Sequence, residues 1–292
     1  MTPPTPPNRD SIRVAFWVVF AVAAGLRLWG IGHSLPFSYY PDESHFVKRA
    51  LSFGSGDLNP HWFHKPALYM YLLFAEYGLL FLVGKMVGLW AGVSDFAVRY
   101  VLDPTAFYLV GRLTTMAFSL ATMWFVFKIG ERWLGRGAGL AGAMAYAVIP
   151  GVVTASQHVK EDVPSMFFAT LSLFYVFRYM DDRRARSLAF AAIAAGASAA
   201  TKAYGLALLL PMAASFFLGT RKPPLRGALV LGATAFALFW VAHFVFAPFS
   251  FLDPLGREAT FGRIVTLAGR LGEIFGVAKP VALPDEFLGR QT

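Results

Sequence analysis

The sequence is dominated by eight apolar runs, which short polar connections separate. A helix that crosses the hydrocarbon core of a bilayer, about 30 Å thick, needs roughly 20 apolar residues, and most of these runs approach that length. Hydrophobic residues make up 57% of the chain and charged residues only 15%, against about 45–50% and roughly 25% in a soluble domain. The sequence therefore predicts an all-α integral membrane protein. The runs are 14–31, 67–87, 107–129, 138–153, 163–179, 188–200, 204–218 and 228–246.

The composition excludes other classes of protein. An intrinsically disordered chain needs low hydrophobicity. A disulfide scaffold or a thiol nucleophile needs cysteine, and this chain has none. The formal net charge of +9 would suit nucleic acid if the basic residues formed a stripe on one surface. They lie instead in short connections between the apolar runs, so we expect no nucleic-acid partner.

The positions of the basic residues predict how the chain is oriented in the membrane. They gather in three connections, at 128–136, 183–186 and 221–226. Two apolar runs separate each of these connections from the next, so all three face one side, which the positive-inside rule makes cytoplasmic. If the N-terminus lies on that side as well, the run 67–87 cannot be a simple single crossing.

Two of the apolar runs need separate treatment. The run 67–87 carries Glu76 near its middle, and a carboxylate at the bilayer centre costs about 2.5–3.5 kcal/mol. We therefore expect a helix over 67–88 along the outer interface, which leaves about seven transmembrane helices. The stretch 188–218 would form a helix of about 46 Å at roughly 1.5 Å per residue, so we expect it to split at 201–205.

These considerations divide the chain into three parts. Residues 1–13 form a disordered cytoplasmic N-terminus. Residues 14–246 form a transmembrane module that begins with a signal anchor, and its outer loop, 32–66, carries an amphipathic surface helix near 43–53. Residues 247–292 form an outer-face tail, the start of a further C-terminal part. We expect a multi-pass protein of the bacterial plasma membrane, with its active site on the outer face.

Most of the charged and polar residues that membrane insertion does not explain lie in the connections expected on the outer face. Each has an ordinary explanation on its own: an acidic pair stabilises a helix start, a lysine or arginine at a span end snorkels, and a lone histidine sits at the interface. Their convergence on one face of one bundle instead indicates a functional site. The candidates are Asp42, Glu43, Lys65, Arg112, Glu161, Asp162 and Lys202, with Tyr40, His61, His64 and His158 as further substrate contacts.

This combination of side chains suits the transfer of a sugar at a membrane surface. A carboxylate accepts the proton of an acceptor hydroxyl, and a positioned base is worth about 10²–10⁴-fold in rate. A lipid phosphate leaving group needs Lys, Arg or a divalent ion to neutralise its developing charge. A second carboxylate holds the metal ion or orients the sugar hydroxyls.

Five motifs in order carry a resemblance to a known family. They are Tyr40-Pro41-Asp42-Glu43, His64-Lys65-Pro66-Ala67-Leu68-Tyr69, Gly111-Arg112, Lys160-Glu161-Asp162-Val163-Pro164 and Thr201-Lys202-Ala203-Tyr204-Gly205. Over residues 14–224 the chain resembles the GT-C class of polyprenyl-phosphate-sugar glycosyltransferases, in the superfamily of protein O-mannosyltransferases and aminoarabinose transferases.

The resemblance implies inverting transfer of a sugar from a polyprenyl-phosphate donor in the membrane lipid to an acceptor hydroxyl of a protein, lipid or glycan. It implies that Asp42 is the base, with Glu43 as its catalytic neighbour, and that Glu161 and Asp162 form a second acidic site. Lys65, Arg112 and Lys202 would bind the donor phosphate. No cofactor is assigned, and a divalent metal ion at Asp42 and Asp162 stays open.

A polyprenyl-lipid or solute transporter is the alternative function. Transporters place charges near the membrane midplane and often contain inverted repeats. In this sequence the charges cluster at the outer ends of the spans and no repeat is visible. The sequence therefore favours the glycosyltransferase.

Overall fold

The computed structural model describes residues 9–37, 40–218 and 223–263, and every regular element in that part of the chain is helical. This confirms the predicted all-α class. The helices are α1 (Arg9–Leu28), α2 (Pro41–Ser52), η1 (Phe53–Ser55), α3 (Leu68–Met86), α4 (Val93–Leu102), α5 (Thr105–Trp133), α6 (Arg136–Val148), α7 (Pro150–Ala155), α8 (Asp162–Asp182), α9 (Ala185–Thr201), η2 (Ala203–Leu208), α10 (Leu209–Ala214), α11 (Leu225–Phe246) and α12 (Phe249–Leu252).

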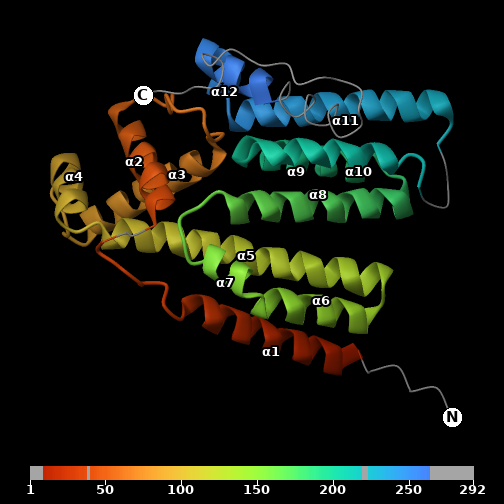
Figure 1. Ribbon diagram of the computed structural model, residues 1–292, viewed down its shortest axis with the longest axis horizontal. Coiled ribbons are helices and arrows are strands. Elements are labelled where there is room, and N and C mark those ends of the chain that lie inside the picture. The colour runs from red at the N-terminus through yellow and green to blue at the C-terminus, as the bar shows by residue number, and fades with distance from the viewer. Residues whose placement is uncertain (1–8, 38–39, 219–222, 264–292) are drawn as a thin grey trace, which may run out of the picture.

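The long helices lie side by side in one bundle (Figure 1). Helix α1 packs on α6, α6 on α5, α5 on α8, α8 on α9, and α9 on α11. Small residues allow the close approach of neighbouring backbones, as they do in many membrane bundles. A Cβ atom at Gly196 of α9, for example, would lie only 2.5 Å from the carbonyl oxygen of Phe239 in α11.

Five helices in the described part are long and apolar enough to cross a membrane: α1, α3, α5, α8 and α11. By length and composition, therefore, the predicted count of seven is not confirmed, because the segments α6, α9 and η2 with α10 are shorter. The predicted break in 188–218 is confirmed, since α9 ends at Thr201 and Lys202 adopts an extended conformation. The chain then reverses through η2 and α10 (Figure 1).

Helix α3 covers the run that we expected at the outer interface. Its length and mean hydropathy are sufficient for a span. It lies, however, obliquely beside α2 at one end of the bundle, and not along the row of long helices (Figure 1). Its packing partners are α2, α5 and α9.

The two ends of the bundle differ in character. The basic connections between α5 and α6 and between α8 and α9 lie at one end, together with the start of α11, which carries Arg226, as the charge pattern predicts (Figure 1). Arg221 and Lys222 of the third basic connection lie outside the described residues. Helices α2, α3 and α4 lie at the opposite end, together with the connection from α7 to α8 and Lys202. Which end faces the cytoplasm stays a prediction from the basic residues.

The predicted terminal segments differ in part from the structure. Residues 9–13, expected to be disordered, form the start of α1. The apolar run follows them directly, and its helix extends toward the N-terminus to include them. Residues 1–8 of that segment, and residues 264–292 of the predicted tail, lie outside the described residues. Within 247–263 the chain forms α12 and further helical turns.

Candidate active site

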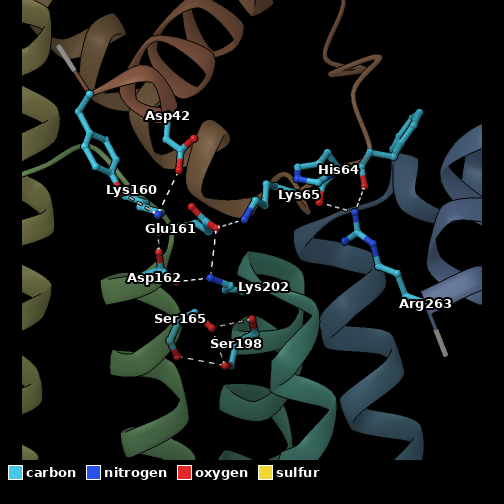
Figure 2. A network of polar contacts seen from close by, with 12 residues as sticks. Asp42, His64, Lys65, Lys160, Glu161, Asp162, Ser165, Ser198, Lys202 and Arg263 are labelled. Carbon is cyan, nitrogen blue, oxygen red and sulfur yellow. Dashed lines mark hydrogen bonds and ion pairs between the residues drawn. The ribbon is translucent and has the colours of Figure 1, made fainter. Parts of the chain in front are cut away.

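Three carboxylates and three lysines alternate in a chain of contacts at the α2 end of the bundle (Figure 2). The order is Asp42, Lys160, Asp162, Lys202, Glu161 and Lys65. They come from four segments that are far apart in the sequence, namely the start of α2, the loop before α3, the start of α8 and the end of α9. We call this set the alternating cluster.

Asp42 lies in the first turn of α2. That helix starts here because Pro41 occupies its first position, where a missing backbone N–H costs nothing. The N-cap residue is Tyr40, and its side chain makes no capping hydrogen bond. The Asp42 side chain is 47% exposed, and its Oδ2 lies 3.1 Å from Nζ of Lys160. Asp42 therefore faces the cluster and solvent at the same time.

Lys160 contacts both Asp42 of α2 and Asp162 of α8. Its Nζ donates to the Tyr40 hydroxyl at 2.9 Å and lies 3.3 Å from Oδ2 of Asp162. Burial alone would lower the pKa of Lys160, but its contacts with Tyr40, Asp42 and Asp162 outweigh burial and raise that pKa. The ammonium group is therefore charged at physiological pH.

Glu161 and Asp162 begin α8 but do not cap it with their side chains. Glu161 is the N-cap residue, and its side chain makes no capping bond. Instead its Oε1 accepts from Lys65 Nζ at 2.6 Å and lies 3.5 Å from Lys202 Nζ, while Lys202 also donates to Asp162. The carboxyl of Glu161 is fully buried, and its Oε2 has no hydrogen-bond partner.

Two serines fix the helices below the cluster. Ser165 of α8 and Ser198 of α9 have their hydroxyl oxygens 3.1 Å apart, and the Ser198 hydroxyl also donates to the Ser165 carbonyl at 3.0 Å (Figure 2). Both side chains are buried. This contact holds the acidic start of α8 beside Lys202.

Glu43 and Arg112 form a separate, buried pair. Arg112 Nε donates to Oε1 of Glu43 at 2.9 Å, and its Nη2 donates to Oε2 at 2.7 Å. The exposed fraction is 2% for the Arg112 side chain and 0% for Glu43. Arg112 Nη1 donates further to the carbonyls of Ile31 and His33. Because both side chains are enclosed by protein partners, we leave them out of the proposed site.

The predicted substrate contacts fall into two groups. The Tyr40 ring packs on His158 with ring centroids 4.5 Å apart, so both lie beside Lys160. His64 lies next to Lys65, and burial, Lys65 and Arg263 lower its pKa. His61 is exposed and pairs with Asp57 at 2.7 Å, apart from the alternating cluster.

A cleft opens beside the cluster. Its volume is about 290 Å³, and it is lined by Asp42, His45, Phe46, Trp62, His64 and Lys65. A larger cleft of about 450 Å³ lies at the opposite end of the bundle, between α1 and α5, where no member of the cluster is found. Because Asp42 and Lys65 of the alternating cluster line the smaller cleft, it is the candidate substrate-binding cleft.

A divalent ion at Asp42 and Asp162 does not fit the arrangement. The ammonium of Lys160 already lies 3.1 Å and 3.3 Å from one oxygen of each carboxylate. Among the described residues, no group of three or more His, Cys, Asp or Glu side chains has the arrangement of a metal site.

Sequence reasoning did not single out Lys160 or Arg263. Lys160 stands in the motif that contains Glu161 and Asp162, and its position two residues before Asp162 was the signal available. Arg263 donates to the carbonyls of Phe63 and His64 (Figure 2) and so ties the segment after α12 to the loop that carries Lys65. No pattern in the sequence predicts that contact.

The fold and this site define a helical membrane protein with an acid-and-lysine centre at one end of its bundle. Residues 107–246, from α5 to the end of α11 and just under half of the chain, match the family model of dolichyl-phosphate-mannose-protein mannosyltransferases. This part of the chain is therefore similar to membrane glycosyltransferases of the GT-C class, and the description of that family names dolichyl-phosphate mannose as the sugar donor. No curated protein sequence gives a significant match.

The matched region contains only part of the alternating cluster. Lys160, Glu161, Asp162 and Lys202 lie inside it, whereas Asp42 and Lys65 come from the segment that precedes it. The contacts of Asp42 with Lys160 and of Lys65 with Glu161 are therefore seen in this structure and are not part of the family match.

Proposed function

We propose that this chain transfers a sugar from a polyprenyl-phosphate donor to an acceptor hydroxyl at the outer face of the plasma membrane. The transfer inverts the anomeric centre, and Asp42 is the base. The observation that carries the proposal is the alternating cluster, which joins a half-exposed carboxylate to lysines that suit a phosphate. The family match supports the same class of reaction.

Asp42 suits the role of base by its position. Its carboxylate lies at the wall of the cleft and is 47% exposed, so an acceptor hydroxyl has access to it. In the proposed step the hydroxyl oxygen bonds to the anomeric carbon and gives its proton to Asp42. The bond from that carbon to the phosphate oxygen breaks, and polyprenyl phosphate leaves with the electron pair. A single displacement of this kind inverts the anomeric centre.

Lys65 and Lys202 suit the donor phosphate. Both ammonium groups contact the same oxygen of Glu161, at 2.6 Å and 3.5 Å, so they converge from two segments on one point. Cations that are fixed before the reaction stabilise the charge that develops on the leaving phosphate. Glu161 keeps them together despite their mutual repulsion.

The activity is tested with the purified full chain in detergent. We would supply polyprenyl-phosphate mannose, then other polyprenyl-phosphate sugars, with a membrane extract as acceptor, and measure free polyprenyl phosphate by mass spectrometry. We expect release with at least one donor. In reconstituted vesicles, movement of intact donor between leaflets without cleavage would contradict the proposal and support transport.

A deletion strain then identifies the sugar and the acceptor. Mass spectrometry of its lipid-linked sugars and glycans should show one donor accumulating and one glycan lost. An unchanged profile would contradict the proposed reaction in that cell.

The outer-face position is tested by cysteine labelling, since the chain has no native cysteine. Ser55 lies in the exposed turn after α2, and Gly137 and Arg186 are exposed at the opposite end of the bundle. With an impermeant maleimide on intact cells, Ser55→Cys should react, while Gly137→Cys and Arg186→Cys should react only after lysis. The reverse pattern would place the cluster in the cytoplasm.

A further inference from the structure

We infer that the ammonium group of Lys160 is the cation that links the two acidic sites, and that it takes the place of a divalent metal ion between Asp42 and Asp162. The inference deepens the proposed function and rests on it for the catalytic role of Asp42. It predicts that this chain transfers sugar without a metal ion.

The geometry of Lys160 carries the inference. One nitrogen lies 3.1 Å from Asp42 and 3.3 Å from Asp162, on oxygens from two segments that are 120 residues apart. It also donates to the Tyr40 hydroxyl at 2.9 Å. An ammonium group has three donors, and these three contacts use all of them.

A metal ion would have to displace this ammonium. Divalent ions bind carboxylate oxygens at about 2.0–2.6 Å, and an ion between Asp42 and Asp162 would therefore lie where the Lys160 nitrogen now lies. The two cations would repel each other at close range. Lys202, which already contacts Asp162, would add to that repulsion.

Lys160 is also held in place. It lies in the short connection between α7 and α8, and its Nζ is 5.3 Å from the centroid of the Tyr40 ring. The same Tyr40 ring packs against His158. His158 is itself held by its Nδ1, which lies 2.8 Å from the carbonyl oxygen of Thr154 at the end of α7. The lysine is therefore part of a packed arrangement and not a loose surface charge.

The three lysines of the cluster thus have different tasks. Lys65 and Lys202 meet at Glu161, which is buried, and suit the donor phosphate. Lys160 meets Asp42 and Asp162, which are partly exposed, and orients the side chain of Asp42. We therefore describe Lys160 as a positioning residue.

The first experiment measures metal content and metal dependence in the wild-type chain. We expect elemental analysis of the purified protein to find no stoichiometric Mg, Ca, Mn or Zn. We also expect EDTA to leave the transfer rate and the melting temperature unchanged. Stoichiometric metal, or loss of transfer with EDTA that Mn²⁺ restores, would overturn the inference and leave the proposed function standing.

The second experiment removes the ammonium. Lys160→Ala should lower transfer by about 10²-fold, because Asp42 then loses the contact that orients it and a positioned base contributes about 10²–10⁴-fold. Propylamine in the buffer should restore part of the rate, and Mg²⁺ or Mn²⁺ should not. Lys160→Arg, which keeps the cation, should retain more activity than Lys160→Ala. Lys48 is exposed on α2 and outside the cluster, so Lys48→Met is the matched control and should be unaffected.

The outcomes separate the two proposals. Wild-type transfer by Lys160→Ala, rescue by a metal ion instead of the amine, or no recovery with either the amine or arginine would overturn the role of Lys160. If the wild-type chain transfers no sugar at all, the proposed function fails. In that case metal content and the EDTA response of the melting temperature still test whether a metal ion lies in this position.

Discussion

Asp42 and Glu43 are neighbours in the sequence, yet they belong to two different regions of the molecule. Successive residues of a helix point about 100° apart, so α2 turns Glu43 toward the core and Asp42 toward the cleft. Glu43 is fully buried and both its oxygens bind Arg112. Asp42 is 47% exposed and contacts one ammonium group. An enclosed carboxylate stabilises structure, whereas a half-open one is available for chemistry.

The enclosed pair nevertheless serves the open cluster. Glu43 Oε1 also accepts from the backbone N–H of Val159 at 2.8 Å, and Val159 directly precedes Lys160. Arg112 at the same time joins α5 to the chain that leaves α1. The buried pair therefore fixes the position of α2 relative to the connection that carries Lys160 and Glu161.

The largest effect is expected from breaking the buried pair. Arg112→Met leaves the Glu43 carboxylate buried without its partner, and such changes cost about 3–5 kcal/mol of stability. We expect a strongly lowered melting temperature in detergent and loss of transfer with it. Arg132 pairs with Asp181 at 2.8 Å on the surface, so Arg132→Met is the control and should cost at most about 1 kcal/mol. Equal melting temperatures for the two variants would contradict the structural role of the buried pair.

The next largest effect is expected at Asp42. Asp42→Asn keeps the size of the side chain and one acceptor oxygen but cannot take up the acceptor proton, so transfer should fall by about 10²-fold or more. The melting temperature should change little, because a charge in a first helical turn is worth about 0.3–1 kcal/mol. The measurement is the initial transfer rate beside a thermal melt. Asp95→Asn, at an exposed position of α4, should behave as wild type. If Asp42→Asn transfers sugar at the wild-type rate, Asp42 is not the base.

These two variants mark what the sequence can and cannot predict. Apolar runs predict the long helices because their length and composition match the bilayer. The outer connections predict one shared face for Asp42, Lys65, Glu161, Asp162 and Lys202, and the structure brings these five together. The role of each in the reaction stays a prediction.

The sequence does not separate Asp42 from Glu43, or Arg112 from the lysines. That distinction depends on how α2 is rotated and on which side chains the neighbouring helices cover. The oblique position of α3 is also set by tertiary packing against α2, α5 and α9. The contact of Arg263 with the loop before α3 spans 200 residues and follows no local pattern.

A smaller effect is expected at the two phosphate lysines. Lys202→Met and Lys65→Met each remove one cation from the proposed donor site, and a lost contact of about 1.4 kcal/mol is a tenfold change. We expect the KM for the polyprenyl-phosphate donor to rise about tenfold, with membrane insertion intact. Steady-state kinetics over a range of donor concentrations measures this, and Lys48→Met is the control. A lysine that only snorkels would leave the donor KM unchanged.

The smallest effect concerns His64, at the edge of the open cluster, and it tests the electrostatic difference between the two regions. Burial, Lys65 and Arg263 hold the pKa of His64 below its usual value. The unfolded chain therefore takes up a proton at this histidine at a higher pH than the folded chain does, and stability falls as pH falls through the usual histidine range near 6.5. His64→Gln removes this histidine's contribution to the pH dependence, so the melting temperature of the variant should fall less between pH 8 and pH 5.5 than that of the wild type. Identical slopes would mean that neither burial nor the charges of Lys65 and Arg263 lower the pKa of His64 in the folded chain.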